Sequence, residues 1–143
     1  SIDEIIKYKE FMGKIVKYVE EDMDEPANVY ASYCQNAIIK ATGSVTIGSA
    51  GVYHSNIHCG KQIHIKGFCR GGEICAGIKV VAKEIGSIMS IPTLVAVSQG
   101  GEIIAGLIHM NVTLKIGGYV RKNINLKKRV KITFKDRWIE DLI

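Results

Sequence analysis

The fold of this chain is decided by residues 45–65, which read VTIGSAGVYHSNIHCGKQIHI. Val45 and Ile47 at the start of this stretch are matched, eighteen residues later, by Ile63 and Ile65 at its end. Small and turn-forming residues, mostly Gly, Ser and Asn, separate the short apolar pairs. A repeat of this length predicts a solenoid, in which each coil buries its apolar residues against the coils above and below.

The same spacing recurs in the second half of the sequence. It relates Ile85 to Ile103 and Ile108 to Leu126, and it relates residues 112–116 to residues 130–134. A β-sandwich does not require such a register. We therefore predict an all-β fold, a parallel β-helix with about 18 residues per coil, over residues 29–143.

Residues 1–26 follow a different pattern. Apolar residues alternate at spacings of three and four, which is the seam of a heptad repeat. These positions are Ile5, Tyr8, Met12, Ile15 and Val19. We expect an N-terminal amphipathic α-helix ended by Pro26, which either covers the open end of the β-core or forms part of a coiled coil joining copies of the protein.

Composition indicates an ordinary folded domain. The chain has 143 residues, of which 47% are hydrophobic and 23% charged. The longest apolar run, residues 103–108, is too short to span a bilayer, so we expect no membrane span. No signal-peptide layout opens the chain and its four cysteines contain no CxxC pair, which predicts reduced thiols in a cytoplasmic protein.

Charge is divided unevenly between the two ends of the chain. Residues 1–25 contain eight acidic residues against four lysines, whereas residues 115–137 contain nine basic residues against one aspartate. This asymmetry predicts either attraction between the ends of neighbouring molecules or binding of an anionic partner.

Nucleic acid is one such anionic partner. Besides the basic C-terminal segment, two aromatic residues lie near basic ones in the sequence, as base stacking requires. The residues are Tyr53, Phe68, Lys61, Lys66 and Arg70. Because aromatic residues are few and no nucleic-acid-binding motif is present, this remains the alternative and not the favoured hypothesis.

Several segments between Ser55 and Ile143 occur in an order found in a known family. They are SNIHCG at 55–60, IHI at 63–65, GGEICA at 71–76, EIGS at 84–87, PTLVAV at 92–97, NVTLKIGG at 111–118 and VKITF at 130–134. In this order they resemble the flagellar assembly protein A (FapA-like) family.

The resemblance implies a right-handed parallel β-helix in a cytoplasmic, non-catalytic protein that acts in scaffolding or regulation around flagellar assembly. This chain departs from the family in two respects. The long coiled-coil insertion that usually follows the segment matching 93–97 is replaced by residues 98–101, and an acidic segment stands in place of the family's N-terminal domain.

A zinc site is one chemical alternative, because all four histidines and three of the cysteines lie between residues 54 and 109. His58 and Cys59 could approach Cys75 from the adjacent coil. However, neighbouring residues on a strand point to opposite faces, so His58 and Cys59 cannot easily bind one ion. We predict no metal site.

An acyltransferase of the left-handed hexapeptide-repeat type is another alternative, with His54, His58 or His64 as general base. Its support is a series of residues spaced six apart, which predicts inward-pointing side chains. The series is Ile57, Ile63, Cys69, Cys75 and Val81. It fails at residues 51 and 87, which are Gly and Ser.

The function expected from the sequence is therefore that of a non-catalytic β-solenoid scaffold. It self-associates or docks protein partners, with no catalytic, cofactor-binding or metal-binding residues.

Overall fold

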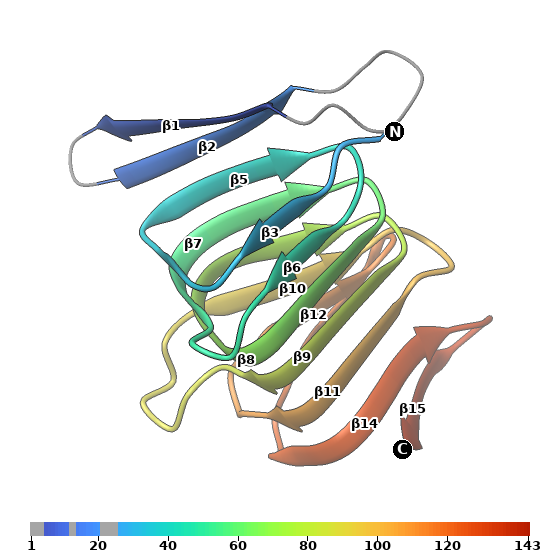
Figure 1. Cartoon of the computed structure of the whole chain (residues 1–143). Coiled ribbons are helices and arrows are strands. Elements are labelled where there is room, and N and C mark those ends of the chain that lie inside the picture. Colours follow the sequence, from blue (N-terminus) through green and yellow to red (C-terminus); the bar gives the residue numbers. More distant parts are fainter. Residues whose placement is uncertain (1–4, 12–13, 21–25) are drawn as a thin grey trace.

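The computed structural model describes residues 5–11, 14–20 and 26–143, and every regular element in these ranges is a β-strand (Figure 1). The first strands are β1 (Ile5–Phe11), β2 (Lys14–Glu20), β3 (Val29–Ala31), β4 (Cys34–Gln35), β5 (Ala37–Ala41), β6 (Val45–Ile47), β7 (Val52–Cys59) and β8 (Gln62–Ala76). The remaining strands are β9 (Lys79–Ile85), β10 (Thr93–Val97), β11 (Glu102–Ile108), β12 (Thr113–Ile116), β13 (Tyr119–Lys122), β14 (Lys127–Phe134) and β15 (Trp138–Leu142).

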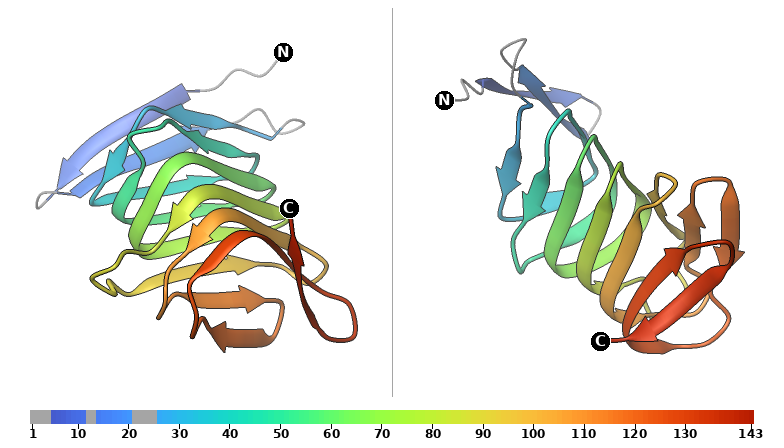
Figure 2. Two further views of the ribbon diagram at one scale, coloured as in Figure 1. Left: turned by 90° about the horizontal axis from the view of Figure 1, so that it is seen from below. Right: turned by 90° about the vertical axis from the view of Figure 1, so that its right-hand side faces the viewer.

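The strands form a solenoid with three parallel ladders, seen as stacked coils in Figure 2. The first ladder contains β3, β6, the start of β8, β9 and β11. The second contains β4, the start of β7, the middle of β8 and the ends of β9 and β11. The third contains β5, the end of β7, the end of β8, β10 and β12. The predicted solenoid of parallel strands is confirmed.

The core is built from rows of inward side chains that stack from coil to coil. One row on the first ladder and one on the third are at most 1% exposed. These rows are Val29, Val45, Ile63, Val80 and Ile103, and Ile39, Ile57, Ile74, Val95 and Leu114. Each buried aliphatic side chain contributes about 1.5–3 kcal/mol. Most of the stability therefore comes from contacts between coils.

The corner before the third ladder is fixed by a buried hydroxyl in two coils. Ser55 Oγ donates to the carbonyl of Tyr53 and accepts from the N–H of Ala37 at 3.1 Å. Thr93 repeats this arrangement with its own neighbours. Between these coils lies Gly72, which has a φ of +84°, and a Cβ there would stand 2.1 Å from the Ser55 carbonyl oxygen. Only glycine fits this corner without strain.

The eighteen-residue spacing is confirmed for part of the chain only. Val45 pairs with Ile63, as predicted. Ile85, however, pairs with Ile108 and not with Ile103, so that prediction is wrong. The reason is the loop at 86–92, which lengthens this coil before β10 begins.

The predicted register at the C-terminal end is also wrong, because the chain reverses direction there. β13 pairs antiparallel with β12, and β14 pairs antiparallel with β11. Ile108 thus faces Lys127 and not Leu126. Residues 112–116 and 130–134 belong to different ladders. Antiparallel strands need only short connections, so they close the end of the solenoid within few residues.

The predicted helix over 1–26 is wrong where the structure describes that segment. β1 and β2 form an antiparallel pair, and β2 adds in parallel to the edge of β5. Residues 5–11 and 14–20 are rich in Ile, Val, Tyr and Phe, which favour strands when a sheet edge is available for pairing. The rest of the predicted helix, apart from Pro26, lies outside the described residues.

Candidate functional site

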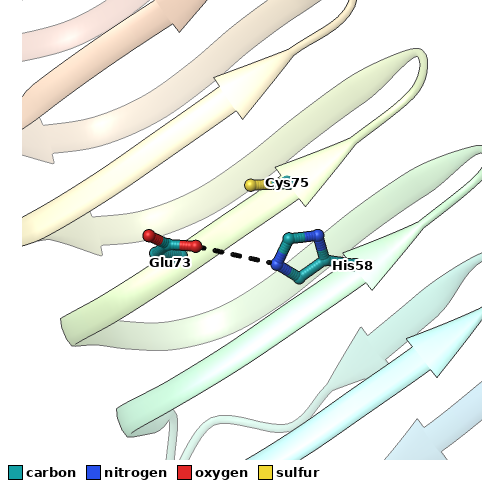
Figure 3. Close-up of side chains that lie close together, drawn as sticks. All are labelled: His58, Glu73 and Cys75. Carbon is teal, nitrogen blue, oxygen red and sulfur yellow. Dashed lines mark ion pairs between the residues drawn. The ribbon is translucent and has the colours of Figure 1, made fainter.

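The outer face of the third ladder brings together three side chains that can act chemically. His58 on β7 lies directly opposite Cys75 on β8, and Glu73 lies two residues before Cys75 on the same face. Figure 3 shows the three side chains projecting from the two neighbouring strands toward one another. We call this group the His–Glu–Cys cluster.

The geometry of the cluster is close. His58 Nε2 stands 3.8 Å from Glu73 Oε2. The imidazole nitrogen, the carboxylate oxygen and the Cys75 sulfur all lie within 4.8 Å of one another. The side chains of His58 and Glu73 are 47% and 51% exposed, so small ligands have open access to them.

The Cys75 thiol is held in its protonated form at neutral pH. Partial burial raises its pKa above the ordinary value, and the negative charge of Glu73 raises the pKa further. The positive charge of Lys115 acts in the opposite direction but does not outweigh these effects. A protonated thiol is a poor nucleophile.

Cys59 does not belong to the cluster. It lies in the inward row between Ala41 and Ala76, one residue after His58. Burial raises the pKa of its thiol as well. The prediction that His58 and Cys59 face opposite ways is confirmed. Glu73, which was not among the residues predicted to approach Cys75, lies beside His58.

Two open depressions flank the cluster on the same face, with volumes of about 780 Å³ and 740 Å³. His58 lines the first and Glu73 lines the second, while Asn56 borders both. Asn56 Oδ1 accepts a hydrogen bond from the backbone N–H of Glu73 at 3.2 Å. The cluster therefore lies where the two depressions meet.

The C-terminal end of the solenoid is a second surface of interest. Among the described strands, β13 pairs only with β12, and β15 only with β14, so each has an unpaired outer edge. Six large apolar side chains in this region are between 49% and 87% exposed. They are Tyr119, Val120, Ile124, Leu126, Leu142 and Ile143.

Ring and charge contacts hold this closing layer in place. Tyr119 stacks on Phe134 with ring centroids 3.9 Å apart, and the Arg121 guanidinium lies 4.9 Å from the Trp138 ring centroid. Lys127 Nζ lies 2.8 Å from Glu140. Although partial burial raises the pKa of Glu140, hydrogen bonds and nearby positive charges, chiefly those of Lys127, lower it below its usual value.

The nine basic residues of 115–137 are mostly exposed and lie in this layer or beside it. Among the described residues, Lys127 is the member of this group that forms an ion pair within 4.0 Å. Lys122 and Lys128 are both exposed, on β13 and β14. The end surface thus combines apolar side chains with a net positive charge.

The two aromatic residues considered for base stacking, Tyr53 and Phe68, have rings that contact other side chains of the protein. The Arg70 guanidinium covers the Phe68 ring at 4.2 Å and reaches to 4.0 Å from Glu84. Glu84 also binds His109 Nε2 at 2.5 Å. Tyr53 contacts Tyr33 with tilted rings 6.2 Å apart, while Lys61 and Lys66 are exposed.

The three histidines that were alternative candidates for a general base lie at three separate places in the solenoid. His58 belongs to the cluster, His64 is exposed on the first ladder and His54 lies at a corner with a φ of +46°. The six-residue series is inward at Ile57, Ile63 and Cys69. Cys75 and Val81 instead point outward, because the corner at 71–72 changes which alternate residues face the core.

No protein-family model, curated protein or solved structure matches this chain significantly.

Within the described residues, no helix has the length and hydropathy needed for a membrane crossing.

Proposed function

We propose that this chain is a non-catalytic scaffold of the FapA-like kind that self-associates through its ends. The observation that carries the proposal is the C-terminal end surface, where unpaired strand edges, exposed apolar side chains and positive charge occur together. Unpaired edges are templates for adding strands of another chain, and exposed apolar patches mark protein contacts.

The occupant proposed for this surface is a second copy of the chain. Residues 1–25 carry a net negative charge and residues 115–137 a net positive charge. Strands β2 and β15 lie at opposite ends of the solenoid (Figure 1). A contact between unlike ends of two copies is heterologous and can repeat, so it produces chains of molecules in place of a closed dimer.

The cellular part of the proposal comes from the family resemblance. Segments between residues 55 and 134 occur in the same order as in that family. This resemblance supports a right-handed winding, a cytoplasmic location and a regulatory role in flagellar assembly.

Light scattering over a concentration series tests self-association. We expect the average mass to rise with protein concentration and to fall as salt screens the attraction between the ends. Lys122→Glu with Lys128→Glu should weaken association at least tenfold. The matched control is Lys61→Glu with Lys66→Glu, which changes the net charge equally at exposed positions away from the end. A mass that stays monomeric at every concentration and salt would contradict the proposal.

The basic surface also favours the alternative of nucleic-acid or anionic-surface binding. That function predicts a mobility shift of single-stranded RNA or DNA at low salt, with an affinity that falls steeply as salt is raised. A strictly monomeric protein that binds nucleic acid and loses binding in the Lys122/Lys128 variant would favour this alternative over the scaffold.

A further inference from the structure

The ligand set of the His–Glu–Cys cluster fits a metal ion. It contains one imidazole nitrogen, one carboxylate oxygen and one sulfur, converging from two adjacent strands. We propose that His58, Glu73 and Cys75 form a binding site for a divalent transition-metal ion of the zinc class, with water completing the coordination.

The distances fit this assignment. Zinc binds nitrogen and oxygen ligands at about 2.0–2.2 Å and thiolate sulfur at about 2.3 Å, so tetrahedral ligand atoms lie roughly 3.3–3.8 Å apart. The 3.8 Å between His58 Nε2 and Glu73 Oε2 is slightly longer than the roughly 3.3–3.6 Å expected for a nitrogen–oxygen pair of ligands. No pair of the three ligand atoms is more than 4.8 Å apart, so small rotations of exposed side chains close the site.

The backbone supplies the rigidity that a metal site needs. His58 and Cys75 are register partners in the third parallel ladder, where Lys40 pairs with His58 on one side and Ala96 pairs with Cys75 on the other. The buried side chains of Ile57 and Ile74, next to His58 and Cys75 in the chain, anchor both strands to the core. The cluster is thus held on a fixed sheet and not on a loop.

The chemistry of the donors selects the class of metal. Imidazole and thiolate ligands favour zinc and its neighbours in the transition series, whereas magnesium and calcium prefer oxygen ligands throughout. Metal binding displaces the proton of the Cys75 thiol, so the ligand is the thiolate.

The test is titration of the intact chain with Co²⁺, followed by competition with Zn²⁺. We expect one ion per chain and a thiolate-to-cobalt absorption band that zinc abolishes. Cys75→Ser should remove the band, and His58→Gln and Glu73→Gln should each weaken binding about tenfold or more. All three positions point outward, so the variants should keep the circular dichroism of the parent chain.

Matched controls separate this site from other donors in the chain. Cys59→Ala removes a thiol whose row neighbours are already Ala41 and Ala76, and His64→Gln removes an exposed histidine from the first ladder. Both should bind cobalt as the parent chain does. Absence of the band in the parent chain, or a Cys75→Ser variant with unchanged spectrum and affinity, would overturn the proposal.

Discussion

The buried thiol of Cys69 predicts a loss of stability at alkaline pH. Cys69 is 0% exposed, and burial raises its pKa from the ordinary value of 9.0 to about 12. Below pH 9 the thiol is protonated in both the folded and unfolded chains. Above it, the unfolded chain releases a proton that the folded chain retains, so the free energy of unfolding falls as pH rises. Each pKa unit corresponds to about 1.4 kcal/mol, which gives a loss of about 4 kcal/mol by pH 12.

Urea denaturation of the parent chain and of Cys69→Ala, under reducing conditions, isolates this effect. Lysines and tyrosines titrate in both proteins, so their contributions cancel in the difference. At about pH 8 the variant should be less stable by about 1 kcal/mol, because it leaves a small cavity. At about pH 10.5 ionisation of Cys69 in the unfolded chain has lowered the parent's free energy of unfolding by about 2 kcal/mol, so the variant should be the more stable protein. A difference that does not change with pH would refute the reasoning.

Three further predictions concern the core, the corner and the C-terminal end. Ile57→Ala removes a fully buried side chain and should lower the free energy of unfolding in urea by about 2–5 kcal/mol. The control Ile38→Ala removes an outward side chain and should lower it by about 1 kcal/mol or less. Gly72→Ala should lower the melting temperature, because Gly72 has a φ of +84° and its new Cβ would stand 2.1 Å from a backbone oxygen. Gly118→Ala is the control: its Cβ meets nothing within 4 Å, so the melting temperature should stay within about 2 °C of the parent. Trp138, the only tryptophan, lies in the closing layer, so acrylamide should quench its fluorescence less at concentrations where the protein self-associates.

The middle of the solenoid was predictable from the sequence because there the core alone sets the spacing. Val45, Ile63 and Val80 follow one another in the ladder at nearly constant intervals, with short glycine-containing corners between them. The spacing failed after Ile85, since a loop can be inserted between coils without disturbing the rows. It failed again at the end, because apolar alternation does not distinguish a parallel strand from an antiparallel one.

The candidate site was only half predictable for a related reason. The sequence separation between His58 and Cys75 predicted that they lie about one coil apart, and their pairing in the third ladder confirms this. The role of Glu73 depends on which alternate residues face outward after the corner at 71–72. Positive φ angles at both glycines reset that alternation, and no six-residue or eighteen-residue count contains this information. A double glycine after an apolar strand was the available signal.

The outward position of the cluster bears on whether it has a function. Inward rows must be apolar for the solenoid to fold, but outward rows are free of this constraint, and their members vary from coil to coil. At the level of the cluster the row runs from Lys40 through His58 and Cys75 to Ala96, so neither its histidine nor its cysteine is repeated in the coils beside it. Parallel strands hold register partners about 4.8 Å apart, which places two such donors within reach of one ion. The fold therefore supplies the spacing at every coil, and the sequence places metal-binding donors at one of them.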